Sequence, residues 1–352
     1  MSWRVPVILA MCVSVHPAFA HHSFAPHFDA SKPVNIAGTV TEYEARNPHS
    51  YLHIAAVDEN GKTQEYVCES HGVTQLTRNG ISREMLAVGT VLRVEGSQSR
   101  NNPYMCFFNV VDFGDGRVMN VNGPGAGQPS GSPQTSVQPA LPARHDIFGT
   151  WLLAPNPNRS TSGPQPMLQF LTPAGERAVA AYDPFRDDPT FRCDPVAIRR
   201  VWGAPATPLQ IVREGDRVIL RHEWMDVERI VYLNMQEHPS DGPRTSLGHS
   251  IGHFEDDTLV IETANYSEGV LSQYVEEPGK PTRGLLHSAA LTSIERLRLD
   301  EGAQRLIVTI DLQDPEFFTR PFATSTTYYA PSDLKIEPFN CSPENQHGSV
   351  RE

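Results

Sequence analysis

A tract rich in proline, glycine, serine and glutamine occupies residues 122–143 and interrupts the chain. It contains few apolar residues that could form a core, and this composition is typical of a linker. The flanking segments, residues 21–121 and 144–352, are each long enough to fold as an independent domain. The sequence therefore predicts two domains joined by a linker.

The first twenty residues have the pattern of a secretory signal peptide. Arg4 precedes an apolar run from Val5 to Val15, and an Ala-x-Ala cleavage site ends at Ala20. The run is about half the roughly 20 residues that a membrane-spanning helix needs, so we expect no transmembrane segment. Lipoprotein processing at Cys12 is the alternative, but the bulky Met11 before it fits that processing poorly. We expect the mature chain to be periplasmic or secreted.

The formal net charge of −12 argues against nucleic acid as a partner, because no cluster of lysine and arginine is available to neutralise phosphates. The chain has five cysteines, of which Cys12 lies in the signal peptide. The four others allow three pairings, and in an oxidising compartment they predict structural disulfides. From the domain boundaries we expect two bridges: Cys68 with Cys106, and Cys193 with Cys341.

Segments of alternating polarity with turn residues between them predict strands throughout the first domain. The order of strand, strand, strand, helix, strand, strand favours a small OB-like barrel. The expected strands are Val34–Glu44, Ser50–Val57, Thr63–Glu69, Val91–Gly96 and Met105–Phe113, with a turn at residues 59–62 and a helix at Val73–Arg78.

The second domain has one expected helix, Pro173–Tyr182, and otherwise a succession of strands. Such a meander predicts a larger antiparallel β-barrel or a sandwich, so the fold class of the whole chain is mainly β. The expected strands are Leu209–Arg213, Arg217–Trp224, Glu228–Leu233, Thr258–Thr263, Leu286–Leu299, Arg305–Leu312 and Thr324–Tyr329.

Cleavage after Ala20 would make His21 the first residue, followed by His22. The α-amine and the Nδ1 atom of His21 can chelate one Cu²⁺ ion, which prefers tetragonal nitrogen sites. A third nitrogen from elsewhere would complete a T-shaped histidine brace. The alternative is that His21 and His22 are unstructured residues left by cleavage, as chain ends often are.

The candidates for the third metal ligand in the first domain are His49, His53 and His71. His49 and His53 would lie roughly 13 Å apart on a straight strand, so they cannot bind one metal ion together. His49 could instead cap a turn after Asn47-Pro48, and His71 could cap the helix that follows it. The signal is stronger for His21 than for these three.

Several short motifs lie along both predicted domains. They are His21-His22-Ser23-Phe24, Gly38-Thr39-Val40, Asn47-Pro48-His49 and Asp58-x-x-Gly61 in the first, and Leu171-Thr172-Pro173, Ser250-Ile251-Gly252, Asp257-Thr258-Leu259-Val260, His287-Ser288 and Glu295-Arg296 in the second. Through these motifs, residues 21 to about 113 resemble a bacterial family of exported domains of unknown function, and the second domain is similar to uncharacterised bacterial proteins. The resemblance implies export and architecture, but no catalyst.

His249, His287 and Glu295 are the candidate catalytic residues of the second domain. If Leu286–Leu299 is one strand, His287 and Glu295 share a face, and a buried pair could serve as acid and base in a polar pocket. The alternative is that Glu295 forms an ion pair and His287 lies at a strand end in water. His249 and His253 also share a face, but they are too far apart to chelate one metal ion.

Two functions of different classes follow. The first is a periplasmic metal-binding protein that holds copper through the mature N-terminal histidine. The second is a β-barrel enzyme or carrier that acts on a small organic molecule in the larger domain. Metal titration separates them, because one extra residue before His21 would destroy the brace and leave a barrel pocket unaffected.

Overall fold

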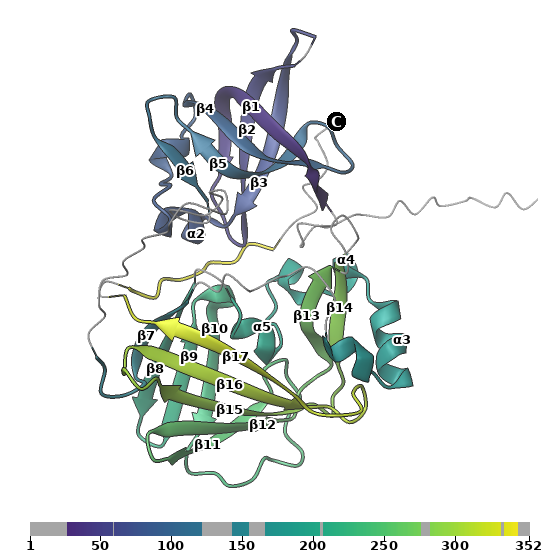
Figure 1. Ribbon diagram of the computed structural model, residues 1–352, viewed down its shortest axis with the longest axis vertical. Coiled ribbons are helices and arrows are strands. Elements are labelled where there is room, and N and C mark those ends of the chain that lie inside the picture. Colours follow the sequence, from purple (N-terminus) through teal and green to yellow (C-terminus); the bar gives the residue numbers. More distant parts are fainter. Residues whose placement is uncertain are drawn as a thin grey trace, which may run out of the picture.

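The computed structural model describes residues 27–58, 60–121, 143–154, 166–204, 207–275, 282–331 and 334–343. Two β-barrels make up most of these residues, one above the other in Figure 1. The expected signal peptide lies outside the described residues, and so do all residues of the expected linker except Ala143.

The first barrel has the topology of an OB fold, as the sequence predicts. Its sheet has the strand order β3-β2-β1-β4-β5-β6, and a parallel pairing of β3 with β5 closes it. The helix α2 lies between β3 and β4, where the sequence places it. The elements are β1 Phe28–Glu44, β2 His49–Val57, β3 Thr63–His71, α2 Val73–Arg78, β4 Val91–Ser99, β5 Met105–Asp112 and β6 Val118–Asn120, with a short 3₁₀ turn at Glu84–Leu86.

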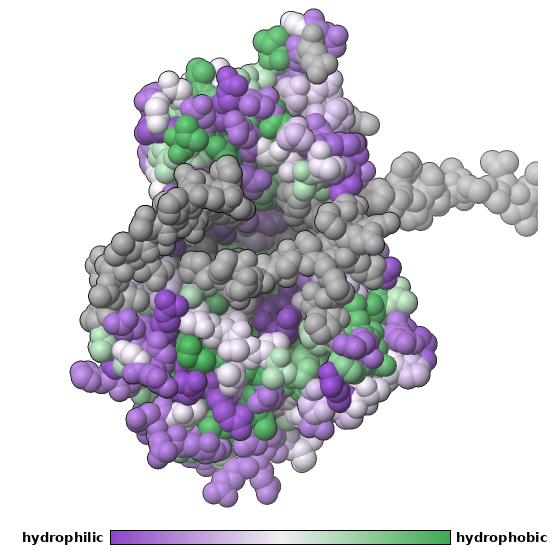
Figure 2. All heavy atoms as spheres, in the orientation of Figure 1, coloured by the Kyte–Doolittle hydropathy of each residue, from purple (hydrophilic) through white to green (hydrophobic). Residues whose placement is uncertain are grey.

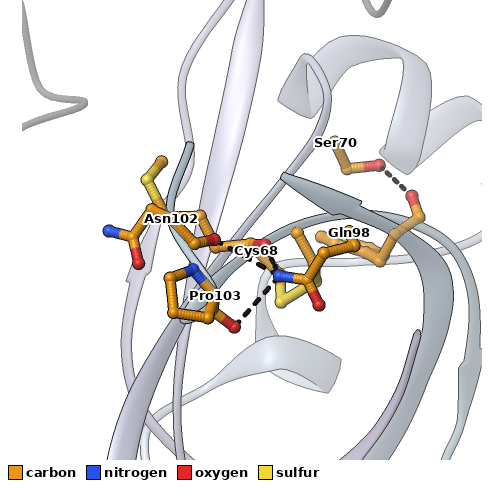
Figure 3. Close-up of a disulfide and its surroundings, with 8 residues drawn as sticks. Cys68, Ser70, Gln98, Asn102 and Pro103 are labelled. Atoms are coloured by element: carbon orange, nitrogen blue, oxygen red, sulfur yellow. Dashed lines mark hydrogen bonds between the residues drawn. A yellow bond between two sulfur atoms is a disulfide. The ribbon is translucent and has the colours of Figure 1, made fainter. Parts of the chain in front are cut away.

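The Cys68–Cys106 disulfide joins the two strands that close this barrel, which confirms the expected pairing. Cys68 and Cys106 are direct partners in the parallel β3–β5 ladder, and both are buried. Beside the bridge, the Gln98 side chain donates hydrogen bonds to the carbonyls of Asn102 and Pro103 (Figure 3). The disulfide thus reinforces a closure that only three residue pairs of the backbone ladder make.

The second barrel is closed by nine strands in the order β10-β11-β12-β15-β16-β17-β7-β8-β9. All neighbouring pairs are antiparallel except β10 with β11, so the barrel alternative of the sequence prediction is the observed one. The strands are β7 Gly149–Leu153, β8 Pro208–Glu214, β9 Arg217–His222, β10 Val227–Tyr232, β11 His249–Glu255, β12 Thr258–Ala264, β15 Thr292–Leu299, β16 Arg305–Gln313 and β17 Phe322–Tyr329.

A separate hairpin and several short helices lie beside this barrel (Figure 1). The expected helix at Pro173 is present, with Thr172 as its N-cap and the proline in its first turn, where a missing N–H costs nothing. These elements are the strands β13 Gly269–Val275 and β14 Thr282–His287, the helices α3 Pro173–Ala181, α4 Pro184–Asp187 and α5 Ile198–Val201, and 3₁₀ turns at Pro166–Phe170, Pro189–Arg192 and Trp224–Asp226.

The expected continuous strand Leu286–Leu299 is wrong. The chain turns between β14 and β15, and the carboxylate of Asp314 accepts hydrogen bonds from the backbone N–H and the hydroxyl of Ser288. Periodicity does not reveal the turn, because the residue that anchors it, Asp314, follows β16, two strands further along the chain. His287 and Glu295 therefore lie on different strands, and the alternation that placed them on one face does not apply.

The C-terminal segment, residues 334–343, runs between the two barrels and contacts both (Figure 1). On one side Asn47 donates a side-chain hydrogen bond to the carbonyl of Phe339. On the other side the Cys193–Cys341 disulfide confirms the second expected bridge, and Asp226 accepts from the backbone N–H of Phe339. No helix among the described residues is long and apolar enough to cross a membrane.

Candidate functional site

His49 and His71 are direct partners in the antiparallel β2–β3 ladder. Side chains that face each other in such a ladder rise from the same face, with their Cβ atoms about 5 Å apart. The Nδ1 atom of His49 lies 2.7 Å from a carboxylate oxygen of Glu69, which is itself buried. A carboxylate beside one ring nitrogen leaves the other nitrogen for a metal ion, an arrangement that is common for metal-binding histidines. Metal coordination by His49 would therefore use its Nε2 atom.

Both histidines line a cavity of about 170 Å³ between the two barrels. In Figure 2 the molecule has a waist at the level where the barrels meet. The cavity is bounded on the side of the OB-like barrel by Asn47, Pro48, His49, His71, Gly72 and Gln75, and on the other side by Thr190, Arg200, Thr207, Trp224, Met225 and Phe339.

On the far wall of this cavity the guanidinium of Arg200 forms an ion pair with a buried carboxylate. Arg200 donates to both carboxylate oxygens of Asp188, at 2.8 and 3.2 Å. Met225 has a positive φ of 61°, and its neighbour Asp226 anchors the C-terminal segment. Met225 also lines this cavity, together with His49 and His71. Its thioether sulfur is a soft metal ligand.

Ring contacts connect His71 to the beginning of β1. The rings of His71 and Phe107 are 5.6 Å apart, and those of Phe107 and Phe28 are also 5.6 Å apart. His27, the first described residue, is buried next to Phe28. The N-terminal end of the described chain therefore lies near His71. His27 carried no sequence signal, because a single histidine before a strand is unremarkable.

The other expected metal ligands are not part of this arrangement. His53 contacts Glu44 at 3.0 Å and Glu65 at 3.7 Å, and its ladder partner is Val67 rather than a histidine. His21 and His22 lie outside the described residues. Within the described part of the chain, no group of three or more histidine, cysteine, aspartate or glutamate side chains is arranged to hold a metal ion.

Glu295 lies inside the larger barrel, where strong donors surround its carboxylate. The guanidinium of Arg229 donates to both oxygens, at 2.6 and 2.7 Å, and the indole of Trp202 donates at 2.7 Å. Arg229 also donates to the hydroxyls of Ser250 and Thr263. Glu295 is fully buried, so this ion pair is the alternative role that the sequence left open for it.

His287 is buried rather than exposed to water at a strand end. Its Nδ1 atom lies 3.0 Å from the carbonyl of Ser288, and burial lowers the pKa of its imidazole. The ring of Tyr266 packs edge-on against it at 5.9 Å, and the Tyr266 hydroxyl is hydrogen-bonded to Ser293. Tyr266 thus stands between His287 and the group around Glu295.

The third candidate catalytic residue, His249, faces the opposite side of its strand. Its neighbour Ser250 points into the barrel and contacts Arg229, so period-two alternation places His249 on the outer face. The structure therefore does not bring His249 together with Glu295.

His222 is a buried histidine that no sequence pattern singles out. It packs edge-on against Trp202 at 5.2 Å, and burial together with the charge of Arg229 lowers its pKa to about 3. Its Nε2 atom has no hydrogen-bond partner among the described residues. His222 is therefore neutral at physiological pH and belongs to the core.

The comparisons with known proteins concern the first barrel only. Residues 9–105 match a protein family that is described as a family of unknown function (DUF6152). Neither the curated proteins nor the solved structures contain a match to the chain. The matched region includes β1, β2, β3 and β4, and hence both His49 and His71.

Proposed function

We propose that the mature chain is an exported copper-binding protein, with its site at the end of the OB-like barrel that faces the interbarrel cavity. The observation that carries the proposal is the pairing of His49 with His71 across β2 and β3 at the wall of this cavity. In the proposed site, the α-amine and the Nδ1 atom of His21 bind Cu²⁺ and His71 supplies the third nitrogen.

His71 is preferred to His49 as the third ligand because of its position relative to the start of β1. His71 is connected by ring contacts through Phe107 to Phe28, and so to the start of β1.

The length of chain before His27 is compatible with such a site. Six residue steps separate His21 from His27, and at no more than about 3.3–3.6 Å per step they reach roughly 20 Å. Because Phe28 lies next to Phe107, and Phe107 next to His71, a segment of this length is long enough for His21 to reach His71.

Export supports the proposal, because a histidine brace requires a newly formed N-terminus at the histidine. The two disulfides fit an oxidising compartment. With a signal peptide that ends at Ala20, we assign the protein to the periplasm and its role to copper sequestration or delivery. We propose that the second barrel closes the cavity, because several of its residues line the wall opposite His49 and His71.

The proposal is tested by titrating Cu²⁺ into correctly processed protein and following binding by calorimetry and by electron paramagnetic resonance. We expect His21→Ala, or one extra residue before His21, to weaken binding by at least about tenfold, since each removes a chelating nitrogen. His71→Ala should weaken it in the same range.

His53→Ala is the matched control, because His53 lies on the same barrel but pairs with Glu44 and Glu65. It should leave copper affinity unchanged, as should His287→Ala in the other barrel. Equal binding by the processed and the extended protein would contradict the brace. Equal loss in the His53 and His71 variants would mean that copper binds unselectively to surface imidazoles.

A further inference from the structure

Two histidines, His238 and His249, lie within hydrogen-bond distance of each other on the outer face of the larger barrel. The Nδ1 atom of His238 lies 3.0 Å from the Nδ1 atom of His249, and the two rings are nearly perpendicular, at 85°. At most one of these nitrogens can carry a proton, which it then donates to the other. The other nitrogen offers its lone pair to the space between the rings.

The surroundings hold both rings in place. The ring of Tyr232 stacks on His249 with a centroid distance of 5.3 Å and an interplanar angle of 12°. His238 precedes Pro239, whose carbonyl accepts a hydrogen bond from the side chain of Asn265 at 2.9 Å. The loop between β10 and β11 is thus fastened to the end of β12 next to His238. Such support lowers the entropic cost of bringing two ligands together.

We propose that His238 and His249 form a second metal site, for a divalent ion that prefers tetragonal nitrogen coordination, Cu²⁺ or Ni²⁺. Two metal–nitrogen bonds of about 2.0–2.1 Å to nitrogens that are 3.0 Å apart enclose an angle of roughly 95°. This is close to the angle between adjacent ligands in a square-planar or tetragonal site. Each imidazole binds through its Nδ1 atom: metal binding replaces the hydrogen bond, and the ring that donated it then carries its proton on Nε2.

The protonation states favour binding. Burial lowers the pKa of His249, and burial together with the nearby His249 lowers the pKa of His238, so both rings are neutral at pH 7. Glu262, on the outer face of β12, acts in the opposite sense on His238 and provides a negative charge close to the pair. The two imidazoles are the ligands that the chain supplies, and water completes the coordination.

This site is independent of the one proposed at His71, and it uses a residue, His238, that no sequence pattern singles out. His238 lies in a loop, eleven residues before His249, and no regular spacing connects them. Only the folding of the β10–β11 loop over the outer face of β11 brings them together.

The test is a titration of the processed, full-length protein with Ni²⁺ and with Cu²⁺, each followed by calorimetry and by visible spectroscopy. We compare wild type with His238→Asn, which can keep a hydrogen bond to His249 but removes one imidazole ligand. His253→Ala is the matched control, because His253 lies on the same strand, is exposed and contacts Glu255. His71→Ala reports on the other proposed site.

We expect the His238→Asn and His249→Ala variants to lose one binding equivalent or to bind it at least about tenfold more weakly. His253→Ala and His71→Ala should retain that equivalent. If His238→Asn binds Ni²⁺ and Cu²⁺ as wild type does, the pair is a structural hydrogen bond only and the proposal is overturned. A thermal unfolding midpoint equal to that of wild type shows that His238→Asn has kept the fold.

Discussion

Two polar clusters, one around Glu295 inside the larger barrel and one around Glu69 at the interbarrel cavity, each contain a buried carboxylate. They differ in how deeply the side chains around that carboxylate are buried and in how many of them it pairs with. Inside the barrel, Glu295 is fully buried, and Arg229 and Trp202 place three donor hydrogens on its carboxylate. At the cavity, His49 and His71 are only partly buried, and a single carboxylate orients one of them.

The difference indicates which cluster is available for a ligand. The carboxylate of Glu295 already accepts three strong hydrogen bonds, and losing one partner of a buried ion pair leaves an uncompensated charge. Imidazoles at the wall of a cavity can accept a metal ion without breaking the core. Substitutions should therefore affect stability in the first cluster and binding in the second.

Arg229→Ala should have the largest effect on stability. It leaves the carboxylate of Glu295 buried with only Trp202 as a strong donor, so we expect the free energy of unfolding to fall by about 3–5 kcal/mol. Urea denaturation measures this change. Arg117→Ala, which removes an exposed ion pair with Asp115, should leave the free energy of unfolding nearly unchanged, because solvent screens that pair. Similar losses of unfolding free energy in the two variants would contradict the expected difference between the buried and the exposed ion pair.

Arg78→Ala should have the next largest effect, because Arg78 joins the two barrels. Its guanidinium donates two hydrogen bonds of 2.5 Å to the carboxylate of Glu223, whose side chain is fully buried. We expect a loss of roughly 2–3 kcal/mol, since Glu223 would keep only the backbone donor of Glu337. Arg83→Ala is the control, because its guanidinium makes an exposed hydrogen bond to a carbonyl. An unchanged unfolding free energy for Arg78→Ala would mean that the barrels are not coupled through this pair.

His222 should make the protein less stable in acid. Its folded pKa of about 3 is below the unfolded value of 6.5, so the contribution of neutral His222 is complete above pH 6.5 and is lost as the pH falls toward 3. Between pH 7 and pH 5 this loss is about 2 kcal/mol in the wild type. His222→Leu should show a shallower decline in that interval, measured by denaturation at each pH. Parallel pH profiles for the two proteins would show that His222 titrates normally.

His71→Ala should have the smallest effect on stability, below about 1 kcal/mol, because the ring is half-buried at a cavity and not in the core. The same denaturation experiment on metal-free protein measures it. A loss comparable to that of Arg229→Ala would assign His71 to the framework of the barrel and remove the contrast between the clusters.

Local patterns in the sequence were sufficient for most of the strands, for the OB-like order and for both disulfides. The same local patterns also determine that His49 lies opposite His71. Once the turn at residues 59–62 sets Val57 opposite Thr63, counting eight residues outward along each strand gives His49 opposite His71. The register of a hairpin is fixed by its turn, so this contact follows from local information.

Tertiary contacts could not be predicted in the same way. Arg229 meets Glu295 only because β10 and β15 lie on opposite sides of β11 and β12 in a closed barrel. The turn at Ser288 depends on Asp314, which follows β16. The His238–His249 contact depends on the path of a loop. Each of these three contacts joins residues whose spacing in the sequence follows no strand or helix period. The alternation of polar and apolar residues therefore does not predict them, and it wrongly predicts a continuous strand through Ser288.

The most direct test of the proposed copper site counts the nitrogen ligands of one Cu²⁺ ion bound to the processed protein. Electron paramagnetic resonance at one equivalent, in the His238→Asn background, resolves the nitrogen couplings of the remaining site. We predict three nitrogens in this background, two when His71→Ala is added, and no change when His53→Ala is added instead. Three nitrogens in the His71→Ala protein would contradict the assignment of His71 as the third ligand.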